Sequence, residues 1–279
     1  MPLSPRSLLA VAFGAFVLNL LRYVLIAVPA FLIFHRRTPQ RLRSRQLGPG
    51  PVGAAQARRE LHYSVMSLGI FGLTGVLMYA MGRAGVSQLY RDERHGPVWF
   101  WLSIPVMLVL HDTYFYWTHR FMHWKPVFKH VHRVHHLSHD PSPLAAYAFH
   151  PLEAVIEAGI APLIALVLPV HRDAFVIFLT LQLFMNVLGH LGFELYPRGL
   201  LRTPLGWLLN TATHHHQHHQ KTNWNFGLYF NVWDRLLGTN HPRYAEAFVA
   251  ATEGAPDPRL HAEPPGGPGL EASPPTAGG

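Results

Sequence analysis

The chain has 279 residues, of which 49% are hydrophobic and 14% charged, and its formal net charge is +8 at pH 7. The hydrophobic residues form long runs, so the composition indicates a membrane protein rather than a soluble basic one. Cysteine is absent, which excludes disulfides, thiolate catalysis and cysteine-ligated metals, whereas histidine is abundant at 21 residues.

The first hydrophobic run covers residues 8–34 and is long enough to cross a bilayer. It is too long for the core of a signal peptide, so we expect an uncleaved membrane helix. Arg22 interrupts the run and has two interpretations. It is either a functional charge within the membrane, or a side chain that snorkels or faces a neighbouring helix, and the second is favoured.

A polar loop at residues 35–60 carries seven of the 23 Lys and Arg residues, all between Arg36 and Arg59. This excess of positive charge is typical of a cytoplasmic loop that contacts anionic lipid heads. No nucleic-acid-binding motif accompanies it. We therefore expect a bilayer, and no nucleic acid, as the partner of this basic segment.

Further hydrophobic runs begin near residues 63 and 98 and cover residues 152–170 and 174–188, the last two as a helical hairpin. Counting the crossings from the basic loop places every dense histidine group on the cytoplasmic face. The sequence thus predicts an all-α integral membrane protein. Its expected architecture is a bundle of about four to five transmembrane or membrane-embedded helices with a cytoplasmic histidine-rich cap.

The first histidine group is HRFMH, in which His119 and His123 are one helical turn apart and share a face. His111 lies two turns earlier. The second group is HRVHH, with His132, His135 and His136 at i, i+3 and i+4 on one helical face. Its neighbours His130 and His139 are interpreted as bystanders.

The third group, HHQHH, repeats the H-x-x-H-H spacing at His215, His218 and His219, with His214 and His216 incidental. A repeated spacing is more specific than a high density of histidine. Eight histidines exceed the four ligands of a tetrahedral zinc, so two metals are expected, and imidazole does not select the element. The alternative is that these histidines sit among lipid heads or bind metal loosely without chemistry.

These motifs resemble the membrane-bound fatty acid hydroxylase and sterol desaturase superfamily over residues 102–239, about half of the chain. The resemblance rests on the three histidine groups, on FHPLE and GHLGFELYP between them, and on NWNFG and WDRLLGT after the third. Departures at His111 and Leu237 are small. The resemblance implies residues 97–245 as the catalytic domain, after N-terminal membrane helices and the basic loop at 1–96, and before a disordered Pro/Gly-rich tail at 246–279.

The resemblance also implies a non-haem di-iron site. The histidines that match its boxes are His119, His123, His132, His135, His136, His215, His218 and His219, and His190 matches a further ligand position. We expect second-layer contacts or additional ligands from His111, Asp112, His150, Glu153 and Asp234. No catalytic residue beyond the metal ligands is predicted.

The expected activity is that of an O2-dependent lipid hydroxylase or desaturase. Two iron ions and O2 would oxidise an unactivated C–H bond of a sterol-like, hopanoid, fatty acyl or related lipid. Electrons would come from an external ferredoxin or a small cytochrome with its reductase, for which the basic loop offers a docking face. The alternatives are a membrane metal transporter or metal-binding protein without oxygenase activity, and a relative that only binds lipid.

Overall fold

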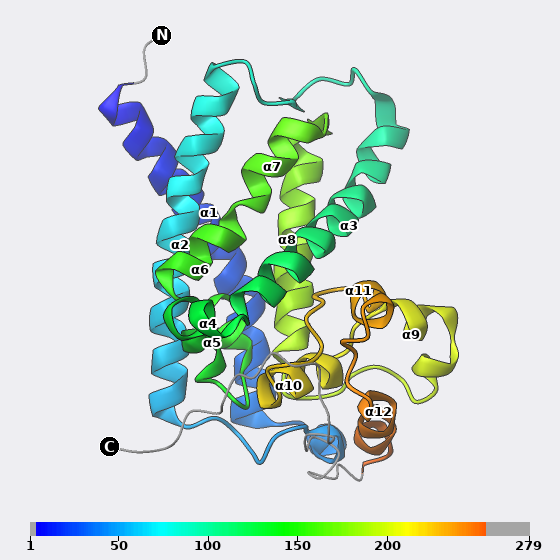
Figure 1. Cartoon of the computed structure of the whole chain (residues 1–279). Coiled ribbons are helices and arrows are strands. Elements are labelled where there is room, and N and C mark those ends of the chain that lie inside the picture. Colours follow the sequence, from blue (N-terminus) through cyan, green and yellow to red (C-terminus); the bar gives the residue numbers. More distant parts are fainter. Residues whose placement is uncertain (1–3, 255–279) are drawn as a thin grey trace.

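The computed structural model of the protein describes residues 4–254, and the described chain is almost entirely helical. Four of the described helices are long and apolar enough to cross a membrane (Figure 1). They are α1 (Pro5–Phe31), continued by a π-helical turn at Leu32–Arg37, α2 (Ala54–Arg83), α3 (Gly96–Met122) and α8 (Arg172–Gly189). The prediction of an all-α integral membrane protein is confirmed.

Shorter helices connect the long ones or follow them. They are α4 (Lys125–Val131), α5 (Arg133–His136), α6 (Pro151–Ala158), α7 (Ile160–Val167), α9 (Pro204–Leu208), α10 (Ala212–Gln220), α11 (Val232–Leu236) and α12 (Tyr244–Glu253). Three 3-10 segments occur at Gln40–Arg45, Pro143–Tyr147 and Leu200–Arg202. Two short parallel strands, β1 (Leu89–Tyr90) and β2 (Val170–His171), tie the α2–α3 loop to the start of α8.

The expected continuous helix at residues 152–170 is divided into α6 and α7 at Gly159. The hydroxyl of Tyr114 on α3 donates to the Ile156 carbonyl at 2.6 Å. The same hydroxyl lies 2.6 Å from the place where a Cβ of residue 159 would be. Pro162 has no N–H to donate to the Ala158 carbonyl, and the Tyr114 hydroxyl takes up the Ile156 carbonyl, so the break has a local cause and a contact from another helix. The second half of the expected hairpin is confirmed as α8.

α1 and α2 pack closely because α2 carries glycine where they meet. A Cβ on Gly72 would lie 2.9 Å from the Ala12 carbonyl oxygen, and one on Gly75 would lie 2.6 Å from the Ala15 Cβ. Small residues allow this close approach of backbones between membrane helices.

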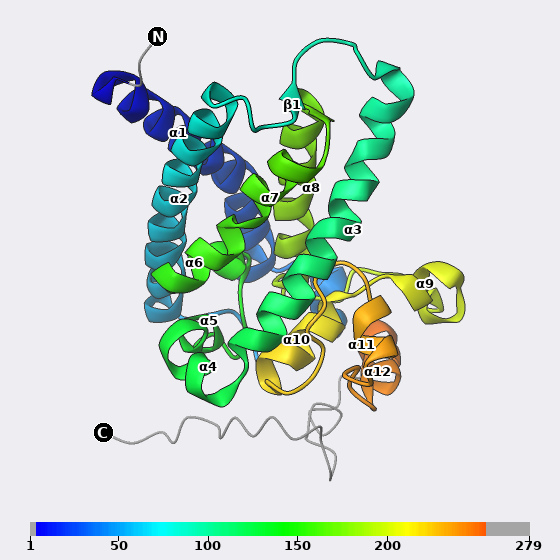
Figure 2. The ribbon, with the colours of Figure 1, turned by 45° about the horizontal axis from the view of Figure 1, so that its top comes forward.

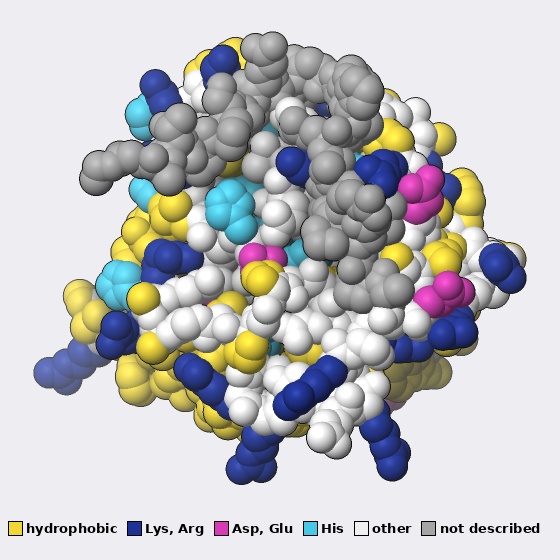
Figure 3. Space-filling view, turned by 90° about the horizontal axis from the view of Figure 1, so that it is seen from below, with side chains coloured by type: hydrophobic (Ala, Val, Ile, Leu, Met, Phe, Trp, Pro, Cys, Tyr) yellow, Lys and Arg dark blue, Asp and Glu magenta, His cyan; other side chains and the backbone are white. Residues whose placement is uncertain are grey.

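The histidine-bearing helices gather at one end of the bundle. The C-terminal end of α3 meets α4, α5 and α10 there, near the loop that joins α1 to α2 (Figures 1 and 2). Viewed from this end, Lys and Arg side chains are spread around the surface (Figure 3), and Arg36, Arg41, Arg58, Lys125 and Lys129 are exposed. The histidine groups and the basic loop thus share one end of the molecule, as the topology count required.

The segment at 246–279 was expected to be a disordered tail. Its first residues belong to α12, whose Ala247, Phe248 and Ala251 are buried. Residues 255–279 lie outside the described part, so the expectation of disorder there stays a prediction.

Candidate metal centre

Five histidines converge in the first group, which contains His119, His123, His132, His136 and His218. One ring nitrogen of each lies within 4.8 Å of the others. The Nε2 atoms of His119 and His132 are 3.0 Å apart, and His136 Nε2 is 3.1 Å from both His132 Nε2 and His218 Nε2. All five side chains are at most 4% exposed. α3, α4, α5 and α10 therefore meet at one buried point.

Four histidines form the second group, which contains His135, His190, His215 and His219. His190 Nε2 lies 3.2 Å from His135 Nε2, 3.1 Å from His215 Nε2 and 3.3 Å from His219 Nε2. The two groups are adjacent, since the ring centroids of His136 and His219 are 4.9 Å apart. The structure brings together the nine histidines proposed as ligands from the sequence.

Each H-x-x-H-H motif contributes to both groups. His132 and His136 belong to the group of five, and His135 between them belongs to the group of four. The motif on α10 does the reverse, because His215 and His219 belong to the group of four and His218 to the group of five. Residues i and i+4 are about 40° apart around a helix, whereas i+3 and i+4 are about 100° apart. One H-x-x-H-H motif can therefore direct side chains to two neighbouring histidine groups.

The Nδ1 atoms of four of these histidines have fixed partners. His119 Nδ1–H donates to the Phe226 carbonyl at 2.8 Å and His218 Nδ1–H to the Trp224 carbonyl at 2.7 Å. His190 Nδ1–H donates to the Asn186 carbonyl at 2.8 Å. A carbonyl can only accept, so in a neutral ring the proton is on Nδ1 and the lone pair on Nε2.

The fourth fixed partner is a carboxylate. His132 Nδ1–H donates to Glu153 Oε1 at 2.7 Å, and both side chains are at most 2% exposed. A carboxylate behind a histidine fixes the ring orientation and makes Nε2 a stronger ligand. Glu153 thus lies behind a proposed ligand, and its second-layer role stays a prediction.

The buried rings are neutral. Burial, reinforced by the neighbouring imidazoles, lowers the pKa of His123, His132 and His136 well below that of an exposed histidine. Burial also lowers the pKa of His190 to about 4. The fixed partners leave the Nε2 lone pairs of His119 and His132 facing each other at 3.0 Å, which a cation between them would satisfy. The residues present fit two metal ions bound by nitrogen.

A loop held by two buried aspartates supplies two of the three carbonyl acceptors, those of Trp224 and Phe226. Asp234 accepts from the backbone N–H groups of Phe226 and Gly227 at 2.9 and 2.7 Å, and Asp112 on α3 accepts from Tyr229 N–H at 2.7 Å. Neither aspartate belongs to the histidine groups. They fix the position of the Phe226 carbonyl, and through it the ring of His119.

The remaining histidines lie outside both groups. His111 Nδ1 pairs with the Tyr229 hydroxyl at 2.8 Å, and His150 Nδ1 accepts from Leu152 N–H at the start of α6. His214 Nε2 lies 3.6 Å from Asp234 Oδ2, and His216 Nε2 lies 3.5 Å from Asp140 Oδ1. His130 and His139 are exposed. His111 and His150 therefore make hydrogen bonds outside the two groups, and their expected second-layer or ligand roles stay predictions.

The sequence analysis missed Glu194, which fixes the start of α10. Its buried carboxylate accepts from the Thr213 backbone N–H and hydroxyl at 3.0 and 2.7 Å. The signal was present in GHLGFELYP, where this acidic residue follows the metal-site candidate His190 by four positions. The carbonyls of Trp224 and Phe226 were also missed, because a backbone group leaves no residue-type signal.

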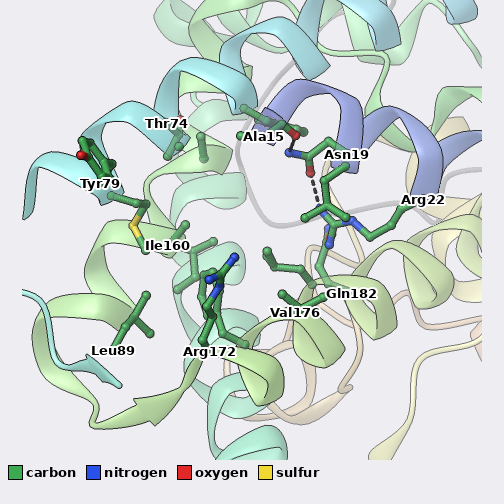
Figure 4. Close-up of a pocket in the computed structure, with 18 of the residues that line it drawn as sticks. Ala15, Asn19, Arg22, Thr74, Tyr79, Leu89, Ile160, Arg172, Val176 and Gln182 are labelled. Carbon is green, nitrogen blue, oxygen red and sulfur yellow. Dashed lines mark hydrogen bonds between the residues drawn. The ribbon is translucent and has the colours of Figure 1, made fainter. Parts of the chain in front are cut away.

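A cavity of about 840 Å³ lies between the membrane helices, with lining residues from α1, α2, α3 and α6 to α8 (Figure 4). Phe115 and Phe149 are part of its lining. The ring of Phe115 lies 4.8 Å from that of His119, and the ring of Phe149 lies 5.3 Å from that of His135. One aromatic side chain therefore separates the cavity from each histidine group.

The fold and the site define a helical membrane protein in which nine buried histidines that could hold metal ions lie near a cavity between the long helices. Residues 104–239 match the fatty acid hydroxylase family. The chain belongs to the fatty acid hydroxylase and sterol desaturase superfamily.

Three relatives illustrate the similarity. Lathosterol oxidase of Homo sapiens is 30% identical over 189 residues, covering 66% of this chain and 61% of the relative. The enzyme of the same name from Mus musculus is 32% identical over 194 residues, covering 67% and 62%. A Delta(7)-sterol 5(6)-desaturase of Gibberella zeae is 26% identical over 240 residues, covering 84% and 63%. The chain thus spans about three fifths of these relatives, and no solved structure matches it.

Proposed function

We propose that this protein is a membrane-bound non-haem di-iron oxidoreductase that uses O2 and external electrons to hydroxylate or desaturate a lipid. The observation that carries the proposal is the convergence of nine buried histidines into neighbouring groups of five and four beside a cavity between membrane helices. The proposed ligands are His119, His123, His132, His136 and His218 for one ion and His135, His190, His215 and His219 for the other. Bound iron would supply the electron transfer to O2 and the oxidation of the C–H bond.

The chain's own residues prepare this chemistry. Carbonyl acceptors and Glu153 hold the proton on Nδ1, so that each fixed ring presents an unprotonated Nε2. Burial keeps bulk water from the ligand nitrogens. Phe115 and Phe149 separate the ligands from the cavity with apolar surface, so hydrocarbon placed against these rings lies next to the proposed ions.

The names of the relatives, lathosterol oxidase and Delta(7)-sterol 5(6)-desaturase, support a lipid of the sterol class. We propose a sterol-like, hopanoid, fatty acyl or related lipid as the substrate class. The exposed arginines and lysines at the histidine end favour an acidic electron donor, such as a ferredoxin or small cytochrome. On the proposed topology this end is cytoplasmic.

The test combines metal analysis with lipid mass spectrometry. The purified wild-type chain should hold about two irons, and cells that express it should gain a lipid heavier by 16 mass units or lighter by 2. His135→Ala removes one ligand of the group of four and should abolish that product. His130→Ala, an exposed histidine on the neighbouring helix, is the matched control and should keep it. A fully active His135→Ala variant would contradict the proposal.

A further inference from the structure

The charged residues that line the cavity between the membrane helices are mostly positive. Four arginines line it, namely Arg22, Arg83, Arg91 and Arg172, against a single acidic residue, Glu157. Arg83, Arg91 and Arg172 are exposed near the end that carries β1 and β2. Such residues are expected where helices leave a membrane, so they need no ligand. Arg22 differs from these three arginines because its side chain is buried between the helices.

Arg22 is 8% exposed, and its side chain points into the cavity from α1 (Figure 4). One guanidinium nitrogen donates to the side-chain oxygen of Asn19, which is neutral. The Nε and Nη1 atoms are buried and have no hydrogen-bond partner within residues 4–254. Glu157 forms no ion pair with it among the described residues. Neither snorkelling nor a facing helix therefore explains this side chain.

A buried guanidinium with unmet donors is costly, because it cannot lose its proton and has been removed from water. Ionisable residues within membrane helices face a partner or a substrate path. The group that best matches a planar guanidinium is a carboxylate, which accepts two parallel hydrogen bonds and neutralises the charge. The surrounding rings and aliphatic side chains, among them Phe71, Phe175 and Leu179, suit hydrocarbon.

We infer that the cavity binds a lipid that carries a carboxylate, and that Arg22 is the residue that selects it. This inference rests on the proposed function for the assignment of the cavity as a substrate site. The preference for a carboxylate rests on Arg22. It separates this chain from an enzyme specific for a lipid whose only polar group is a neutral hydroxyl. Along α8, Arg172 at the outer end and Gln182 beside Arg22 in Figure 4 are ten residues, or about 15 Å, apart. The carboxylate would therefore sit well inside the cavity.

The experiment measures binding rather than turnover. The full-length iron-loaded protein in lipid nanodiscs is kept without O2 at about pH 8.5 and titrated with hexadecanoate or hexadecanol, with native mass spectrometry as the readout. The wild type should bind hexadecanoate about tenfold or more tightly than hexadecanol. Arg22→Gln should abolish that preference, and Arg22→Lys should keep part of it. The matched control Arg6→Gln, an exposed arginine on the same helix that does not line the cavity, should keep the preference within about twofold.

Thermal unfolding of the lipid-free variants separates binding from a structural role. Removal of an unpaired buried charge should leave Arg22→Gln as stable as the wild type or more stable. A large loss of stability would show that Arg22 supports the fold and would overturn the inference, as would equal binding of the two probes by the wild type. A protein that prefers hexadecanoate but oxidises no lipid would contradict the proposed function and leave the inference standing. A protein that oxidises a sterol and binds the two probes equally would overturn the inference and leave the proposed function standing.

Discussion

At the scale of single residues, the proposed centre depends on atoms behind the ligands. An imidazole can present either nitrogen, and the partner of the other nitrogen decides which. Three of the fixed partners are backbone carbonyls, which no substitution removes directly. Glu153 is the one side chain among them, and so it is where this layer can be tested.

Glu153→Ala removes the acceptor of His132 Nδ1–H and leaves that ring free to turn. Loss of such a second-layer partner typically lowers metal affinity 10- to 100-fold. We expect weaker iron retention on titration with a chelator, with a larger loss for Glu153→Ala than for Glu153→Gln, which keeps an oxygen acceptor. Glu246→Ala, an exposed change on α12, is the control. Unchanged retention in Glu153→Ala would show that the carboxylate does not orient the ligand.

Ligand type and helical spacing are local properties, so the sequence alone singles out eight of the nine histidines that the structure brings together, whereas His190 came from the family resemblance. It could not assign them to ions. His135 lies between His132 and His136 in sequence yet faces the other group, because the assignment depends on where α8 and α10 pack. Arg22 shows the same limit. Its position inside a hydrophobic run is plain in the sequence, but its orientation into a cavity depends on the five other helices that line that cavity.

At the scale of secondary structure, hydrophobic length predicted the long helices and missed the division of residues 152–170. The break at Gly159 has a local cause in Pro162, which lacks an N–H, and a second contribution from Tyr114 on α3, which the sequence of residues 152–170 does not show. The contact of α1 with α2 was likewise unpredicted. It matters for function because α1 carries Arg22 and α2 lines the same cavity.

The contact between α1 and α2 can be tested with two glycines on α2. Gly72→Ala would place a Cβ 2.9 Å from the Ala12 carbonyl and force the helices apart, whereas nothing lies within 4 Å of a Cβ at Gly69. Both changes gain the same helix propensity. We expect Gly72→Ala to be less stable than Gly69→Ala by about 1–3 kcal/mol in thermal unfolding. Equal stability of the two variants would show that the helices adjust freely.

At the scale of the whole molecule, the buried histidines should make the metal-free protein sensitive to acid. Burial lowers the pKa of His190 to about 4 and that of His214 to about 3, from 6.5 when exposed. As the pH falls below 6.5 the unfolded chain takes up protons that the folded chain refuses, so the free energy of unfolding falls. The contribution of these neutral histidines to the free energy of unfolding is fully present above pH 6.5 and is lost as the pH falls toward 4.

We expect the unfolding midpoint of the metal-free protein to drop by roughly 10 °C or more between pH 7.5 and pH 5. Circular dichroism in detergent measures it. His214→Gln replaces one of these groups with a side chain that does not titrate and should reduce the dependence. A midpoint that does not change with pH would mean that the histidines are not buried as neutral rings.

The division of each H-x-x-H-H motif between the two groups has a topological consequence. His136 and His218 are 82 residues apart in the chain, and their Nε2 atoms are 3.1 Å apart. His135 and His190, 55 residues apart, meet in the other group. If each group holds an ion as proposed, each ion closes a long loop of the chain, and the loops overlap because α5 and α10 enter both. In a protein with no cysteine, the metal pair would then act as its cross-links, restricting the unfolded chain as disulfides do elsewhere.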